Sequence, residues 1–318
     1  ARPGFDPAAT PPAFAEFVEK VQPVLKKSCS AASCHGNDVA DLSLTCGDDD
    51  AQLKWNAWMS AQFIATAPEA SEFVRRPLDP SRGGVFHEGG VVFESADDEG
   101  YKALLAWAKS AGAPKTDGFD EGFRYFANRV QPMMVRKGCM FLGCHSPSMF
   151  HDLRLSGGSG GHFSLAATRR NYEQSKLLLA IEAPDPNVSR LIKKNLYPYD
   201  RDIDQQAIGT RHRGGALFED VPKKSDVVTT SAPSLDDCKT FDLDKGPLDG
   251  LPGYCVFARW HELERKASVA KGPSKGGVAA EPLSAVVWIE RPPHTDVPQA
   301  FDTYRPGASL HLSPAVLD

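Results

Sequence analysis

The chain has 318 residues, of which 41% are hydrophobic, and this is enough for two compact domains of about 100 to 150 residues each. Its formal net charge of −5 and isoelectric point near 6.0 lack the basic surplus of proteins that bind nucleic acids or anionic membranes. No apolar run reaches the roughly 18 to 20 residues of a membrane span, so we expect neither a nucleic-acid partner nor a span in this chain.

The first predicted element is a helix near the N-terminus, where Phe14, Phe17 and Val21 recur at helical steps. A cysteine motif, CSAASCH, follows this helix from Cys29 to His35. Three further segments come next, namely EFVRRPLDP at 72–80, HEGGVVF at 87–93 and YKALLAW at 101–107. The last of them again has helical periodicity.

Each of these segments recurs later in the chain, in the same order. The second copies are Phe123, Phe126 and Val130, then CMFLGCH at 139–145, RLIKKNLYP at 190–198, HRGGALF at 212–218 and YCVFARW at 254–260. One unit has therefore been duplicated. We predict a mainly α fold of two tandem domains with long loops, at residues 1–113 and 119–270, joined by a short polar linker.

The second copy is longer than the first. Its extra residues, at 146–162, 199–211 and 221–253, are rich in Gly, Pro, Asp and Ser, which predicts surface loops. Residues 271–318 match neither copy, and their segment LSAVVWIERPP predicts a β-strand. This C-terminal part is interpreted as an extended tail or as the start of a further domain.

Both cysteine motifs read C-x-x-x-x-C-H, a pattern that chance seldom produces twice. In c-type haem attachment two thiols add across the haem vinyl groups and the adjacent histidine binds the iron, usually from C-x-x-C-H. A longer spacer only enlarges the loop, so we expect two covalently bound haems c. One would be held by Cys29, Cys34 and His35, the other by Cys139, Cys144 and His145. Two disulfides or a zinc site are the alternatives.

The two motifs, the H-x-G-G segments that follow them and the two closing helices with a tryptophan resemble the planctomycete-type cytochrome c domains, which have the C-x-x-x-x-C-H haem motif. The resemblance covers about 250 residues and implies haem attachment in cytochrome c-like domains, but a family does not fix the physiological role. The long insertion in the second copy departs from the pattern and could cover its haem or change its ligand.

The second axial ligand of each iron is expected from the H-x-G-G segments. Only His87 and His212 occupy equivalent places in both copies, and Gly-Gly after each would let the backbone approach the flat macrocycle. The iron ligands would then be His35 with His87 and His145 with His212. A surface histidine in a Gly turn is the alternative for each, and other candidates in the second copy are His151 and His162. Met149, four residues after His145, is too close in sequence to reach the opposite haem face.

A basic pair precedes each of these histidines. Arg75 and Arg76 in the first copy match Lys193 and Lys194 in the second. They could neutralise haem propionates, or they could be solvated surface pairs.

The three remaining cysteines relate to the cellular compartment in which the protein is found. Covalent haem attachment implies an oxidising exterior, so Cys238 and Cys255 could form a disulfide across the second copy's insertion, leaving Cys46 as a buried thiol. We expect an extracytoplasmic protein, periplasmic or at the cell surface, shown as its mature form after signal-peptide removal.

Bis-histidine ligation leaves no open position on the iron, which favours electron transfer over catalysis. The main hypothesis is a dihaem electron carrier that exchanges electrons with redox partner proteins, alone or within a larger redox complex. A dihaem peroxidase-like enzyme with one open iron and a haem-bearing scaffold are the alternatives.

Overall fold

The computed structural model describes most of the chain. It covers residues 5–37, 41–115, 118–141, 143–147, 149, 152–159, 161–196, 212–218 and 233–271, together with two short strands at 286–289 and 312–315. Residues 1–268 form one compact unit and residues 269–318 another. Both copies of the repeat lie in the first unit. We call residues 14–111 the first repeat and residues 121–268 the second. The boundaries expected at 113, 119 and 270 stay predictions.

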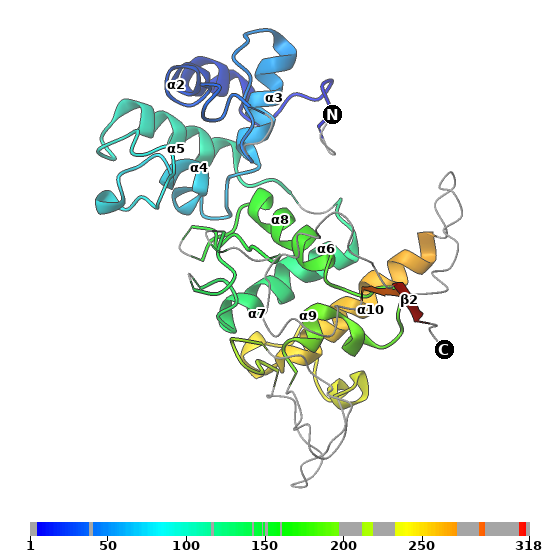
Figure 1. Ribbon diagram of the computed structural model, residues 1–318. Coiled ribbons are helices and arrows are strands. Elements are labelled where there is room, and N and C mark those ends of the chain that lie inside the picture. The colour runs from blue at the N-terminus through cyan, green and yellow to red at the C-terminus, as the bar shows by residue number, and fades with distance from the viewer. Residues whose placement is uncertain are drawn as a thin grey trace, which may run out of the picture. The chain divides into compact units, whose positions relative to one another are not determined.

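The described residues are mainly helical, as the sequence predicted (Figure 1). The α-helices are α1 (Phe14–Glu16), α2 (Gln22–Ser28), α3 (Asp50–Ala61), α4 (Glu72–Arg75), α5 (Glu99–Ala111), α6 (Glu121–Tyr125), α7 (Gln131–Arg136), α8 (Leu165–Lys176), α9 (Arg190–Lys193) and α10 (Gly253–Lys271). Strand β1 (Val286–Ile289) pairs antiparallel with β2 (Leu312–Ala315), which confirms the predicted β character of the C-terminal segment.

A π-helical turn lies at the same place in each repeat, at Phe17–Val21 and Phe126–Val130. In both cases the next helix begins with Gln-Pro, so a proline occupies its first turn. Proline lacks an N–H and its ring crowds the carbonyl four residues earlier, so the helix widens ahead of it. The resulting turn points one phenylalanine, Phe17 or Phe126, fully into the core.

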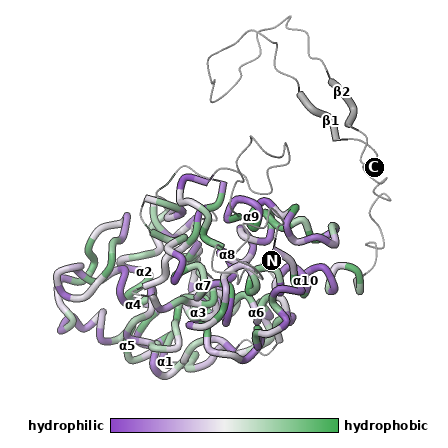
Figure 2. The backbone as a smooth tube through the Cα atoms, turned by 90° about the horizontal axis from the view of Figure 1, so that it is seen from below, coloured by the Kyte–Doolittle hydropathy of each residue, from purple (hydrophilic) through white to green (hydrophobic). Residues whose placement is uncertain are grey.

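Each repeat has its own hydrophobic core. In the first repeat Phe17 packs on Trp107 of α5 with ring centroids 5.0 Å apart, and in the second Phe126 packs on Trp260 of α10 at the same distance. Both tryptophans are completely buried. Figure 2 shows hydrophobic residues recurring along the helices between hydrophilic ones, as amphipathic helices require. The closing helices therefore anchor the two cores in the same way.

Helices α3 and α8 are equivalent, a correspondence that sequence analysis missed. Asn56 of α3 donates to Gln22 Oε1 over 3.1 Å, and Asn171 of α8 donates to Gln131 Oε1 over 3.0 Å. Each asparagine also bonds the backbone of the chain that leads into its own helix. A buried amide must satisfy both its donor and its acceptor groups, so this network fixes helix and loop together.

The insertion expected at 146–162 is shorter than predicted. The segment DLSL at 41–44 matches DLRL at 152–155, and the amides of Leu44 and Leu155 donate to the carbonyls of His35 and His145 over 2.7 and 2.6 Å. Residues up to Ser156 therefore have counterparts in the first repeat. Ser156 lies 15 residues before Asn171, whereas Thr45 lies 11 before Asn56, so only part of the stretch leading into α8 is extra. The predicted loop residues 199–211 and 221–232 lie outside the described residues.

A disulfide joins Cys238 to Cys255 of α10, the same pair that the sequence predicted. Cys238 ends the short 3-10 turn Leu235–Cys238 within the second repeat's insertion, and both cysteines are buried. The bond therefore ties the end of the insertion to the closing helix.

Candidate metal and cofactor sites

The two cysteine motifs fold into the same loop. In the first repeat α2 ends at Ser28, the amide of His35 donates to the carbonyl of Cys29 over 3.1 Å, and the amide of Cys34 donates to Ala31 over 2.8 Å. The second repeat has the equivalent two hydrogen bonds, at 3.0 and 2.8 Å. One loop geometry thus presents two thiols and an imidazole in each repeat.

The four motif cysteines are free thiols in the structure. Burial, and to a smaller degree the nearby Cys34, raise the pKa of the Cys29 thiol to about 11. Burial likewise raises the pKa of Cys139 to about 11, with Cys144 adding to the effect. The two thiols of each motif therefore lie close enough to interact, and the more buried one keeps its proton at neutral pH.

The predicted histidine pairs come together in both repeats. The rings of His35 and His87 have centroids 6.0 Å apart and planes only 6° from parallel. Those of His145 and His212 have centroids 6.1 Å apart and planes 15° from parallel. All four side chains are half-buried. Two pairs that are far apart in sequence thus reach nearly the same mutual geometry.

A backbone carbonyl fixes the orientation of each of these imidazoles. The Nδ1 atoms lie 2.9 Å from Leu42 O for His35, 2.9 Å from Leu153 O for His145, 2.9 Å from Gly90 O for His87 and 3.0 Å from Gly215 O for His212. A carbonyl can only accept, so Nδ1 carries the proton and Nε2 holds the lone pair of the neutral ring. A carbonyl acceptor at Nδ1 is typical of histidines that bind a metal through Nε2.

The two glycines of each H-x-G-G segment shape the turn around its histidine. The sequence pattern instead predicts that they make room for a macrocycle. Gly90 has φ of 81° and Gly215 has φ of 83°, a conformation that favours glycine and directs each carbonyl to the histidine of its own turn. A Cβ on Gly89 would lie 3.0 Å from the ring of His87, and Gly214 has the same relation to His212. The glycines thus serve the imidazole itself.

The environment of His35 favours its neutral form. Burial is the largest effect and lowers the pKa of His35, and the charges of His87 and Arg76 lower it further, against the hydrogen bond to Leu42, which raises it. The neutral imidazole is the form that binds metal ions.

Large apolar side chains are exposed beside these sites. Phe86 and Val91 flank His87 in the sequence and are 75% and 48% exposed, and Phe141 of the second cysteine loop is 66% exposed. Phe86 and Val91 belong to the first repeat and Phe141 to the second, so each repeat has an exposed apolar side chain in one of its two site segments, where a ligand or partner could cover it.

The basic pairs behave differently in the two repeats. Arg75 Nε donates to Gly83 O over 2.7 Å, and Arg76 pairs with Glu72 over 2.6 Å. Lys193 and Lys194 are half-buried and make no ion pair among the described residues. A role for these side chains toward haem propionates stays a prediction.

The other residues singled out from the sequence lie elsewhere. His162 is exposed and its backbone pairs with Ser159, Met149 is half-buried, and His151 lies outside the described residues. Cys46 is exposed, so the expectation of a buried thiol was wrong, and its Sγ donates to Ser30 O over 3.2 Å. Near it in the sequence, Asp49 is the N-cap of α3, and its carboxylate accepts from the amide of Gln52.

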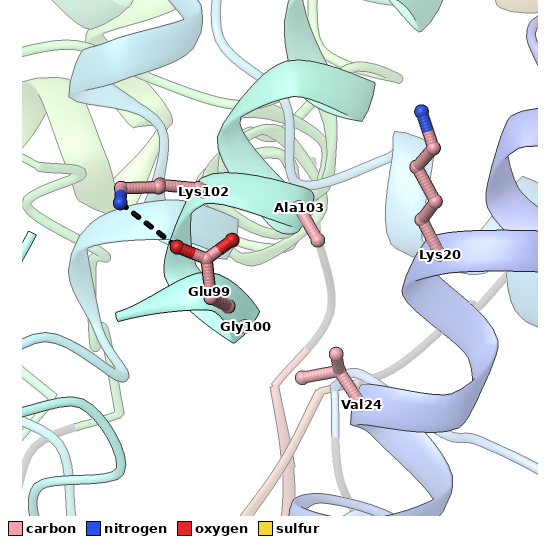
Figure 3. A pocket seen from close by; sticks show the side chains of 6 residues that line it. All are labelled: Lys20, Val24, Glu99, Gly100, Lys102 and Ala103. Carbon is pink, nitrogen blue, oxygen red and sulfur yellow. Dashed lines mark hydrogen bonds and ion pairs between the residues drawn. The ribbon is translucent and has the colours of Figure 1, made fainter. Parts of the chain in front are cut away.

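An open hollow of about 510 Å³ lies between the N-terminal helices and α5, and none of the predicted site residues lines it (Figure 3). Its lining residues are Lys20, Val24, Glu99, Gly100, Lys102 and Ala103. Lys102 is already paired with Glu99 over 2.9 Å. Within the described part of the chain, no group of three or more His, Cys, Asp or Glu side chains could hold a metal ion. The candidate metal ligands of each repeat are therefore its two paired histidines, and among the residues that the structure describes the cysteines beside them do not complete a larger ligand group.

No protein-family model matches the chain, and no match was found among curated proteins or solved structures. None of the described helices is long and apolar enough to cross a membrane.

Proposed function

We propose that the chain is an extracytoplasmic dihaem c-type cytochrome, in which two irons, each bound by two histidines, pass single electrons between redox partner proteins. The observation that carries this proposal is the occurrence, twice, of a nearly parallel histidine pair beside a C-x-x-x-x-C-H loop. The two-domain cytochrome c-like organisation, with a separate tail at 271–318, is part of the same proposal.

The spacing of the imidazoles fits one metal ion between them. A metal–nitrogen bond of about 2.0–2.1 Å on each side, plus the distance from each nitrogen to its ring centre, places two opposed imidazoles with centroids roughly 6 Å apart. The observed values are 6.0 and 6.1 Å. The carbonyls at Nδ1 leave Nε2 as the ligand atom of every ring.

The surroundings fit a flat, largely apolar group held by thioethers. Each loop offers two unpaired thiols near its histidine, and a bound macrocycle would cover apolar side chains such as Phe86 and Phe141. Haem iron supplies reversible one-electron chemistry, and a second histidine in place of a methionine keeps its potential low. The chain's own residues hold the two ligands and leave no position for a substrate.

The disulfide supports the proposed compartment. Cys238–Cys255 is a buried bond of the second repeat's scaffold, and structural disulfides persist in oxidising compartments such as the periplasm and cell surface.

Intact-mass spectrometry of the denatured protein tests the proposal. We expect the polypeptide mass plus two haems, reduced to one in Cys29→Ala/Cys34→Ala and to one in Cys139→Ala/Cys144→Ala. Cys46→Ala is the matched control and should keep both haems, because this thiol belongs to neither motif. A native chain that carries one covalent haem or none would overturn the proposal.

A further inference from the structure

The loop that carries His87 is held by the two arginines that precede it. Arg75 Nε donates to the carbonyl of Gly83 over 2.7 Å, and the Arg75 carbonyl accepts from the amide of Val85 over 3.0 Å. Arg76 Nη1 donates to the carbonyl of Phe86, the residue immediately before His87, over 3.1 Å. Three hydrogen bonds thus fix the chain between Gly83 and His87.

A buried carboxylate orients Arg76. Glu72 lies one helical turn earlier and is only 5% exposed, and its Oε1 accepts from Arg76 Nη2 over 2.6 Å and from Arg76 Nε over 3.2 Å. Such a two-point contact restricts the guanidinium to one plane, which leaves Nη1 directed at Phe86.

The second oxygen of Glu72 is held by the other repeat. Glu72 Oε2 accepts from Ser164 Oγ over 3.1 Å, and Ser164 is the N-cap of α8. Two residues further on, the amide of Ala166 donates to Gln62 O over 2.9 Å, so the contact between the repeats does not depend on the Ser164 hydroxyl alone. Both oxygens of Glu72 therefore have hydrogen-bond partners, which fix the carboxylate from two directions.

We propose that Arg76 is a positioning residue for the distal ligand His87, oriented by Glu72, which is in turn anchored to the second repeat by Ser164. This inference rests on the proposed function, because His87 is a ligand only if an iron is bound. The charge of Arg76 also reaches the other histidine of the pair, His35, whose pKa it lowers after the larger effect of burial.

The matching position in the second repeat cannot make the same contacts. Lys194 stands where Arg76 does and carries a single ammonium in place of a planar fork with five donors. The same backbone hydrogen bond closes the segment in both repeats, from Phe93 to Pro77 and from Phe218 to Asn195, so the difference between the repeats is in the side chains. We therefore expect loss of Arg76 to affect the first site alone.

The test uses the native protein and its Arg76→Gln, Arg76→Lys and Glu72→Gln variants, with Arg82→Gln as the matched control. Arg82 is an exposed arginine at the start of the same loop, and among the described residues no hydrogen bond or ion pair is seen between its side chain and the segment that carries His87. Haem content is measured first by denaturing mass spectrometry, then carbon monoxide binding to the reduced protein, then hydrogen exchange of the peptides at 83–91 and 212–218.

Arg76→Gln should keep two haems, bind up to one carbon monoxide per chain and exchange several-fold faster at 83–91, with 212–218 unchanged. Glu72→Gln should show the same change to a smaller degree, Arg76→Lys should recover part of the wild-type behaviour, and Arg82→Gln should match wild type. If Arg76→Gln does not fold, the two conservative variants decide the matter.

Two haems with no carbon monoxide binding and unchanged exchange in all Arg76 and Glu72 variants would overturn this inference and leave the proposed function standing. Faster exchange in both repeats together would also overturn it, because that outcome indicates a general structural role. Absence of covalent haem from the native protein would overturn both.

Discussion

The two repeats bury the same tryptophan in different surroundings. Trp260 Nε1 donates to Glu264 over 3.1 Å, whereas Trp107 Nε1 has no hydrogen-bond partner among the described residues. Glu264 is only 2% exposed and also binds Lys176 over 2.5 Å and Tyr172 over 2.7 Å. The residue at the corresponding place in α5 is Ala111. In the described part of the chain, the indole of Trp107 is thus held by apolar packing alone, whereas the indole of Trp260 also joins a buried network of charged and polar side chains.

This difference shows what a duplicated core tolerates. A buried indole N–H without a hydrogen-bond partner costs about 1–3 kcal/mol. Apolar packing around Trp107 can offset a cost of this size. A buried carboxylate costs several kcal/mol unless a cation and hydrogen-bond donors surround it, and Glu264 has all of these. Gly122 makes room for it, because a Cβ there would lie 2.1 Å from Glu264 Oε1. The second repeat is therefore the one that a single change can damage most.

The largest effect is expected for Glu264→Ala. It leaves the Lys176 ammonium and two further donors without their acceptor, so the free energy of unfolding should fall by about 3–5 kcal/mol. The matched control is Glu262→Ala, which removes two surface ion pairs from the same helix and should cost at most about 1 kcal/mol. Urea unfolding measures both, and equal losses would show that Glu264 does not hold the core.

The second prediction concerns the disulfide, which only the second repeat contains among the described residues. Replacing Cys238 and Cys255 together by Ala should cost roughly 3 kcal/mol, because the bond closes a loop across a sequence separation of 17. Hydrogen exchange should rise in α10 and stay unchanged in α5. A uniform rise in both helices would contradict the assignment of the bond to one repeat's stability.

A smaller effect, equal in the two repeats, is expected for the motif thiols in chain produced without haem attachment. Burial raises the pKa of Cys29 and Cys139 to about 11. In the unfolded chain a cysteine thiol has a pKa of about 8.5, so the folded state holds these protons more tightly. The protonated thiols therefore contribute to the free energy of unfolding at pH values below the pKa of the unfolded chain, and this contribution is lost as the pH rises toward 11. Alkylation at both cysteines should accelerate up to pH 11, with exposed Cys46 as the internal reference. A plateau near pH 9 would contradict their burial.

Much of the arrangement followed from local repetition in the sequence. The pairing of His35 with His87 and of His145 with His212 was predicted because the H-x-G-G segments recur in order, and the Cys238–Cys255 bond was predicted from its place in the insertion. The π-helical turns follow from the Gln-Pro pairs, which are visible in the sequence but not decisive on their own.

The parts that were missed depend on long-range contacts. The equivalence of Asn56 and Asn171 rests on hydrogen bonds to distant glutamines, although the paired DLSL and DLRL segments could have revealed it. The contact from Ser164 to Glu72 joins the two repeats, and no periodicity within one repeat can predict it. The charge network of Glu264 likewise combines residues from α8 and α10.

The central claim is that each iron is bound by two histidines, and carbon monoxide binding to the reduced wild-type protein tests it most directly. If two imidazoles bind each iron, the visible spectrum should be that of a low-spin, six-coordinate haem and should not change when carbon monoxide is added. His87→Ala and His212→Ala should each then bind one carbon monoxide per chain. Stoichiometric binding by the wild-type protein would contradict the claim and indicate an open iron, as in a haem enzyme.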